Sequence, residues 1–109
     1  MPVDHVVLFD MQPGTDETQI AAAIEGLNAL PSKIPWIRSW AIREDVGRRE
    51  GSYRFVLLAR FDDLAAVERY LADPAHVAAV ELAAPIVLRI AEHDHTVSED
   101  PASQAAELR

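Results

Sequence analysis

Hydrophobic residues recur along the chain with two spacings, one typical of β-strands and the other of α-helices. Residues 3–9 (VDHVVLF) carry apolar side chains at both parities, which is typical of a strand covered on both faces. Within this segment His5, Val7 and Phe9 share one face, because side chains alternate along a strand. We therefore predict a strand in the middle of a sheet.

A helix is predicted after the turn residues that follow this strand. Thr15 or Asp16 can cap its N-terminus, since both side chains accept hydrogen bonds from free backbone N–H groups. The apolar residues then follow at spacings of three and four, which places them on one stripe: Ile20, Ala23, Ile24, Leu27 and Leu30. We expect this stripe to pack on a sheet and Pro31 to end the helix.

Two further strands are predicted on either side of a polar segment. Residues 36–43 (WIRSWAIR) have mixed character, whereas residues 53–61 (YRFVLLARF) alternate clearly. Residues 44–52 are polar and contain glycine, as expected of an exposed hairpin loop. We interpret Arg48 and Arg49 as a solvated loop tip, with an anion site as the less favoured alternative.

A broken helix is predicted from Asp62 or Asp63, either of which can cap it. Its first part places Leu64, Val67 and Leu71 at helical spacing. At Asp73-Pro74 the helix restarts, because proline loses no required N–H at a first helical position and aspartate can cap the new helix. We expect the second part to pack through Val77, Val80 and Ala84.

The chain ends with a last strand and a polar tail. The strand is expected from about Arg89 to Val97, with His93 and His95 on one of its faces. From Ser98 the composition becomes polar. We therefore expect a domain over residues 1–97 and a mobile C-terminal tail over residues 98–109.

This order of elements predicts an α+β fold: a ferredoxin-like split βαβ unit with a four-stranded antiparallel sheet. Its helices would cover one face of the sheet. The other face would carry many apolar residues, too large a patch to leave in water. We expect two copies to pair through this face, forming a dimeric α/β barrel.

Composition removes several functional classes. The 109 residues carry a formal net charge of −8, which argues against nucleic acid and anionic membranes as partners. There is no cysteine, so disulfides, thiol nucleophiles and thiolate metal sites are excluded. The sequence has no apolar run of membrane-spanning length and no signal-peptide pattern at its start, and we expect a cytoplasmic protein.

Tyr70 and His76 lie on either side of the helix restart at Asp73-Pro74. His76 would be the third residue of the second helix, where the positive end of the helix dipole disfavours imidazolium. A neutral imidazole can act as a general base. The alternative is a capped helix corner in which His76 is partly buried and Tyr70 is a core aromatic, and spacing alone favours this alternative.

The chain resembles the stress-responsive dimeric α/β barrel (Dabb) family from about Val3 to Thr96. The residues that carry the resemblance are 5–9 (HVVLF), 13–15 (PGT), 34–37 (IPWI), 51–53 (GSY), 60–63 (RFDD) and 70–77 (YLADPAHV). The resemblance implies a homodimer, with each sheet forming half of a barrel. It also implies a ligand cavity between the sheet and the helices.

The best-understood catalytic type in this family is a plant polyketide cyclase, olivetolic acid cyclase, which closes a poly-β-ketone by aldol condensation without a cofactor. The resemblance implies that Tyr70 and His76 match its catalytic pair and that His5 matches its first-strand histidine. Two positions depart from it: Leu27 stands where the cyclase has a pocket tyrosine, and Phe55 where it has a histidine. The pocket of this chain is therefore expected to be more apolar.

We hypothesise a small-molecule-binding protein that acts as a cofactor-free cyclase or lyase on a polyketide-like or carbonyl substrate. His76 would take a proton from a carbon next to a carbonyl, and Tyr70 would donate a hydrogen bond to the oxygen. His5 would line the cavity and orient the ligand or His76. An apolar wall is expected from Phe9, Leu27, Phe55 and Leu57. The alternative is a non-catalytic structural or binding dimer.

A metal site is a weaker possibility. His93 and His95 form a His-x-His pair on one strand face, but a useful site needs a third or fourth ligand. We therefore predict no metal. The sequence also has no dedicated haem or flavin signature.

Overall fold

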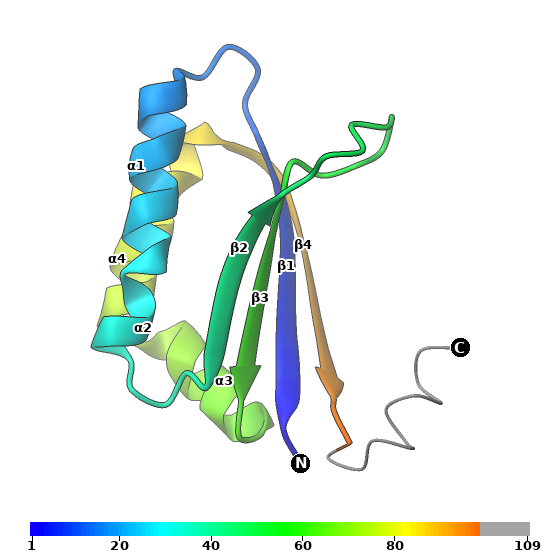
Figure 1. Cartoon of the computed structure of the whole chain (residues 1–109). Coiled ribbons are helices and arrows are strands. Elements are labelled where there is room, and N and C mark those ends of the chain that lie inside the picture. The colour runs from blue at the N-terminus through cyan, green and yellow to red at the C-terminus, as the bar shows by residue number, and fades with distance from the viewer. Residues whose placement is uncertain (99–109) are drawn as a thin grey trace.

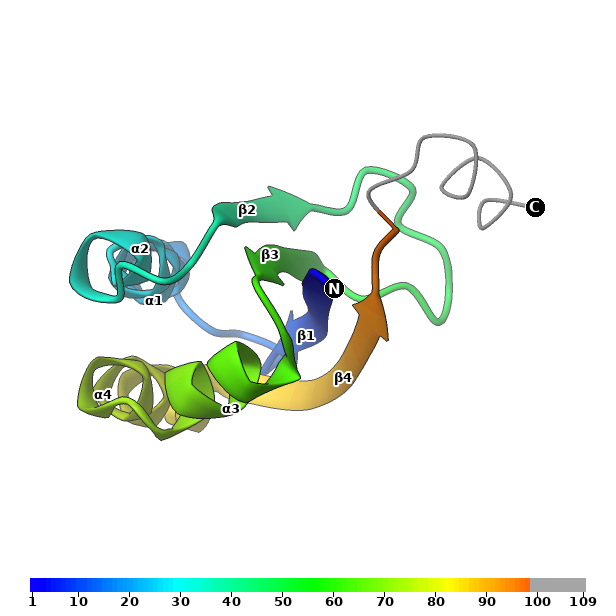
Figure 2. The same ribbon diagram turned by 90° about the horizontal axis from the view of Figure 1, so that it is seen from below.

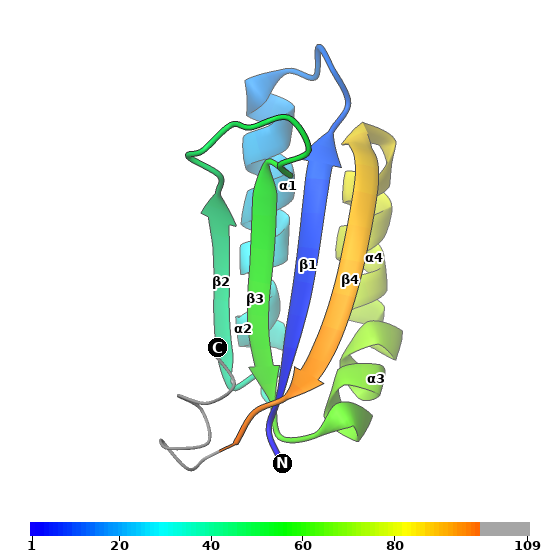
Figure 3. The same ribbon diagram turned by 90° about the vertical axis from the view of Figure 1, so that its right-hand side faces the viewer.

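The computed structural model describes residues 1–98, which form a four-stranded antiparallel sheet with its helices on one face (Figure 1, Figure 2). The elements in chain order are β1 (Val3–Met11), α1 (Glu17–Asn28), α2 (Leu30–Lys33), β2 (Ser39–Glu44), β3 (Phe55–Phe61), α3 (Leu64–Ala72), α4 (Pro74–Ala83), the 3-10 turn η1 (Ala84–Ile86) and β4 (Val87–Thr96). The strand order across the sheet is β2-β3-β1-β4 (Figure 3). The ferredoxin-like α+β prediction is confirmed.

β1 lies between β3 and β4, and its side chains alternate between the two faces of the sheet. On the helix-covered face, His5 pairs with Ala59 of β3 and with Asp94 of β4. His5, Val7 and Phe9 are all buried, as their shared parity predicts. The central strand therefore carries polar His5 into the core beside its apolar neighbours.

Aspartates cap the N-termini of the three longer helices. Asp16 accepts a hydrogen bond from the Thr18 N–H, and Asp63 accepts one from the Ala66 N–H. Asp73 accepts one from the Ala75 N–H, so the restart at Asp73-Pro74 is confirmed. These caps satisfy N–H groups that have no partner within the helix.

Pro31 does not end α1, contrary to the prediction. α1 ends at Asn28, and Pro31 lies in the first turn of the short helix α2. Proline is compatible with a first helical turn, because the N–H groups there have no intrahelical partner. Leu30 still packs in the core with 1% of its surface exposed, so the turn extends the apolar stripe of α1.

The strand boundaries differ from the prediction by a few residues. β2 begins at Ser39 instead of residue 36, and β4 begins at Val87 instead of Arg89. β3 begins at Phe55, because the Arg54 N–H donates to the Asp10 side chain. The residues 99–109 of the predicted tail lie outside the described residues.

The inner face of α4 is made of alanines, and the expected packing through Val77, Val80 and Ala84 is wrong. Val77 and Val80 are 41% and 44% exposed. The residues of α4 that pack toward the core instead are Ala75, Ala79 and Ala83. Alanines and valines of α4 both lie at helical spacing, and packing selects the alanine side.

Candidate functional site

A cavity of about 380 Å³ lies between the helix-covered face of the sheet and the helices. β1, β3 and β4 supply one side of it, and α1, α3 and α4 supply the other. Its lining is mostly apolar, and it includes all three of the predicted polar residues: His5, Tyr70 and His76. The structure therefore brings His5 of β1 to the corner between α3 and α4 that carries Tyr70 and His76.

Tyr70 lies in the last turn of α3 and is 1% exposed. Its ring contacts the His76 ring, with 4.5 Å between their centroids. Within residues 1–98 the Tyr70 hydroxyl has no hydrogen-bond partner. Every fully buried side-chain oxygen in that range does have one, so this hydroxyl is not fully buried and reaches the cavity that Tyr70 lines. Burial, and secondly the charge of Glu92, raise the pKa of Tyr70, so its hydroxyl stays protonated and can donate.

His76 has a defined tautomer. Its Nδ1 lies 3.0 Å from the Leu71 carbonyl oxygen, which can only accept, so Nδ1 carries the proton and donates. The Nε2 lone pair is left available for a ligand. Burial lowers the pKa of His76, so the neutral form is favoured. The predicted direction is right, but the leading cause is burial rather than the helix dipole.

His5 is 2% exposed and is held by a carboxylate. Its Nδ1 lies 2.6 Å from Oδ1 of Asp94, and its ring lies edge-on to the Tyr70 ring at 5.9 Å between centroids. A carboxylate that bonds one ring nitrogen fixes the orientation of an imidazole. Asp94 therefore holds His5 in place beside Tyr70.

Three of the four expected wall residues line the cavity: Phe9, Leu27 and Leu57. Phe55 does not. It stacks on Phe9 with 5.4 Å between ring centroids and supports the wall from behind. Phe55 lies on the helix-covered face of the sheet, as predicted. It is the first residue of β3, however, where it pairs with Phe9 and lies beside α1.

Sequence reasoning missed Glu92 and Asp94. Glu92 lines the cavity, and Asp94 holds His5. A signal was present, because His93 and His95 share one face of β4 and the intervening residue must point to the other. That Asp94 meets His5 depends on the β1–β4 register, which the sequence does not reveal.

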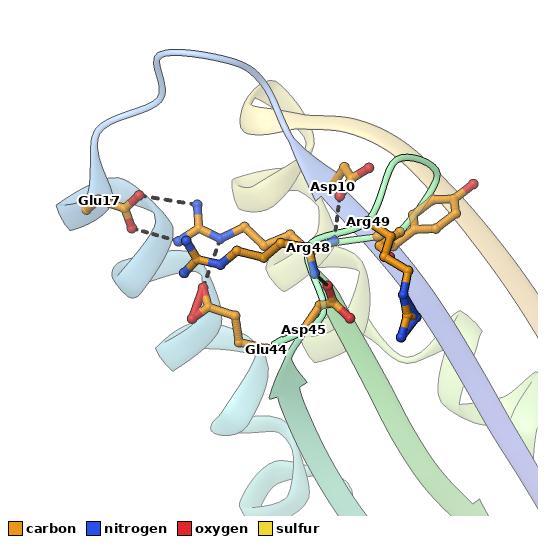
Figure 4. A pocket seen from close by; sticks show the side chains of 9 residues that line it. Asp10, Glu17, Glu44, Asp45, Arg48 and Arg49 are labelled. Atoms are coloured by element: carbon orange, nitrogen blue, oxygen red, sulfur yellow. Dashed lines mark hydrogen bonds and ion pairs between the residues drawn. The ribbon is translucent and has the colours of Figure 1, made fainter.

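A second hollow, which is polar, lies at the loop between β2 and β3 and measures about 410 Å³. Glu17 and Glu44 point toward one guanidinium, that of Arg54, whereas Arg49 points away from them (Figure 4). Asp10 and Asp45 add two more carboxylates to its lining. Arg48 and Arg49 also line this hollow and are exposed, as expected of a solvated loop tip.

His93 and His95 lie on the sheet face opposite the cavity. Their ring centroids are 5.2 Å apart, and His95 Nε2 lies 3.7 Å from Asp4 Oδ2. In residues 1–98 no group of three or more histidine, aspartate or glutamate side chains is placed to hold a metal ion. No helix in the same part of the chain is long and apolar enough to cross a membrane.

Comparison with known proteins agrees with the fold. The stress responsive A/B barrel domain matches residues 3–97. An uncharacterised protein of Streptomyces coelicolor is 35% identical over 82 residues, 73% of this chain and 84% of that protein. A dimeric ferredoxin-like protein of unknown function from Thermobifida fusca superposes with a TM-score of 0.79 at 27% identity, over 89% of this chain and 92% of that one.

A hydroxynitrile lyase from Passiflora edulis has a TM-score of 0.81, over 91% of this chain and 95% of its own. At 17% identity this is a likeness of fold alone. The family match, by contrast, covers both the first strand with His5 and the helix pair with Tyr70 and His76. The chain belongs to the stress responsive A/B barrel domain family.

Proposed function

We propose that the protein binds a small carbonyl compound in the cavity and moves a proton at the carbon next to the carbonyl, acting as a cofactor-independent cyclase or lyase. One observation carries this proposal: the bond from His76 Nδ1 to the Leu71 carbonyl leaves Nε2 free, and the His76 ring lies 4.5 Å from the Tyr70 ring between centroids. A base and a hydrogen-bond donor therefore meet in a largely apolar cavity. Such a combination suits enolate chemistry.

The proposed chemistry needs only these groups. Neutral His76 accepts the α-proton at Nε2, and the C–H electron pair moves into an enolate. Tyr70 donates a hydrogen bond to the enolate oxygen as its charge develops. In a cyclase, the enolate carbon then bonds to a second carbonyl carbon of the same molecule. The resulting alkoxide takes the proton back from His76, so atoms and charge balance.

His5 supports this arrangement as a group that orients the ligand. Its Nδ1 is committed to Asp94, so only Nε2 remains for the cavity. The apolar side chains of Phe9, Leu27 and Leu57 would hold the hydrocarbon part of a polyketide-like ligand. The resemblance to polyketide cyclases supports the substrate class, whereas Leu27 and the displaced Phe55 favour a less polar compound.

We further propose a homodimer formed by the uncovered sheet face. At its centre the register places Val6 beside Leu58 and Leu8 beside Val56. Ion pairs lie toward the ends, from Arg60 to Asp4 and from Arg89 to Asp10. An apolar centre with polar ends suits the packing of one sheet on another. The dimeric description of the Thermobifida fusca relative supports this arrangement.

The decisive experiment measures α-proton exchange rather than an unknown product. The probe is 4-oxo-4-phenylbutanamide, an uncharged aryl ketone, incubated with protein in D2O and followed by proton NMR. We expect exchange above the buffer rate with the wild type and none with His76→Ala. His95→Ala is the matched control, because His95 lies on the opposite sheet face and should leave the rate unchanged.

Thermal unfolding with the same probe separates catalysis from binding. If the probe raises the thermal midpoint of the wild type but exchange stays at the buffer rate, the protein is a binding dimer without this chemistry. Equal exchange by the wild type and His76→Ala would remove His76 from the role of base.

A further inference from the structure

We propose that Glu92 is a specificity-determining residue that makes the cavity select uncharged carbonyl compounds over carboxylates. This inference rests on the proposed function, because it names the class of ligand that the same cavity takes. It comes from the charges on the cavity wall. Five titratable residues line the cavity, namely His5, Tyr70, His76, Arg89 and Glu92.

Arg89 does not offer its charge to the cavity. Its Nε donates to Asp10 Oδ2 at 2.6 Å, and its Nη2 donates to the Ser52 carbonyl at 3.2 Å. Its guanidinium also lies 4.1 Å from the centre of the Tyr53 ring. None of these three partners is among the residues that line the cavity. The one arginine of the wall therefore cannot serve as a ready counter-ion for a bound carboxylate.

Glu92 is the charge that remains. It pairs in register with Val7, which places it on the helix-covered face of the edge strand β4. Within residues 1–98 the structure records no ion pair or hydrogen bond to its side chain. Its charge acts on the other cavity residues. It is a secondary cause of the raised pKa of Tyr70, and it partly opposes the lowering of the His76 pKa by burial.

The other polar groups of the cavity do not cancel this charge. Tyr70 and His76 are both favoured in their neutral forms, by burial in each case. His5 is paired with Asp94, so that pair carries either no net charge or a negative one. A carboxylate in the cavity would meet like charge from Glu92, and because Glu92 is exposed this repulsion depends on salt. A neutral ketone or amide would not.

The rim of the cavity fits the same class of ligand. Val80, Leu88 and Ile90 line the cavity and are 44%, 51% and 58% exposed. An entrance with apolar side chains and one carboxylate admits an apolar, uncharged molecule most readily. Specificity would thus come from repulsion of the wrong ligand as well as from contact with the right one.

The test compares 4-oxo-4-phenylbutanamide with 4-oxo-4-phenylbutanoate, which differ in charge but hardly in shape. Affinities are measured by titration calorimetry at neutral pH. We expect the wild type to bind the amide on the order of tenfold more tightly than the acid. Glu92→Gln should improve binding of the acid and leave the amide unchanged, while Glu81→Gln, an exposed residue of α4 outside the lining, should change neither.

Salt gives an independent readout. Between about 0.01 M and about 1 M salt the Debye length falls from about 30 Å to about 3 Å. The preference for the amide should therefore shrink in the wild type as salt rises, and change less in Glu92→Gln. Equal affinity of the wild type for both probes, or an unchanged ratio in Glu92→Gln, overturns the role of Glu92 and leaves the proposed cavity standing. Failure of the folded wild type to bind either probe overturns both.

Discussion

The two faces of the sheet have the same apolar centre but use their polar residues differently. On the helix-covered face, polar side chains gather in the interior around one cavity, with His5 and Tyr70 almost fully buried. On the uncovered face, ion pairs such as that of Asp4 with Arg60 lie toward the ends, and His93 and Arg43 flank the apolar centre. The polar groups of the first face line the cavity, and those of the second surround an apolar strip.

The proposed ligand site and the proposed dimer interface would give one sheet two separate roles. Burying a hydrogen-bonding group without a partner costs free energy, and a bound ligand would supply the missing partner. Charges already paired at the ends of an apolar strip suit a protein partner, because the partner need not supply a counter-charge for them. The predictions below test whether the two faces are independent in this way.

The largest effect is expected from Leu58→Glu on the uncovered face. Leu58 is 44% exposed in the single chain and lies beside Val6. In the proposed dimer a glutamate there would be buried without a partner, at a cost of several kcal/mol per charge. We expect light scattering after size exclusion to show a monomer.

Leu82→Glu is the matched control for this change. Leu82 is 78% exposed on α4 and should leave the dimer intact. A wild type that is monomeric at every concentration measured would contradict the proposed interface.

Tyr70→Phe should produce the next largest effect, confined to the covered face. Loss of one donor to a developing oxyanion commonly lowers a rate by about 10²- to 10³-fold. Because the hydroxyl has no recorded partner among residues 1–98, the free energy of unfolding should change by only about 0.5 kcal/mol. Proton exchange of the probe and denaturant unfolding measure the two quantities. Tyr53→Phe, which changes the other tyrosine, should affect neither the rate nor the stability.

Asp94→Ala should have a smaller effect, chiefly on stability. It leaves the buried His5 without its acceptor, which costs about 1–3 kcal/mol. Asp94→Asn keeps an acceptor oxygen and should recover part of this loss. For comparison, Asp62→Ala breaks a pair with Arg38 whose side chains are 60% and 54% exposed, and solvent screening should make its effect on stability much smaller. Equal losses in Asp94→Ala and Asp62→Ala would show that His5 does not depend on the pair.

The smallest effect is a pH dependence that comes from His76. Burial lowers its pKa below the usual value of 6.5, so the folded state takes up the proton less readily than the unfolded chain. Its contribution to stability is therefore present above pH 6.5 and is lost as the pH falls through the lowered pKa. Proton exchange should rise with pH through that same lowered pKa and be flat at neutral pH. His76→Gln should flatten the stability profile in this window, and an unaltered profile would contradict the assignment.

Much of the covered face was predictable from local chemistry. The buried parity of β1, the aspartate caps and the restart at Asp73-Pro74 all depend on residues close together in the chain. The same restart lies between Tyr70 and His76, but spacing alone favours a packed helix corner, and only the structure shows that their rings meet at the cavity. The inner face of α4 was not predictable, because alanines and valines both fit a helical stripe and only packing selects between them.

The sequence by itself determined the order of the four strands and the three longer helices, the candidate caps and the candidate pair of Tyr70 and His76. Only the tertiary structure decided that Asp94 holds His5, that Glu92 faces the cavity and that Phe55 stands behind its wall. The physical reason is that these contacts depend on the register between strands distant in the chain. One residue of slip would exchange the two faces of β4, and no local pattern records which register was chosen.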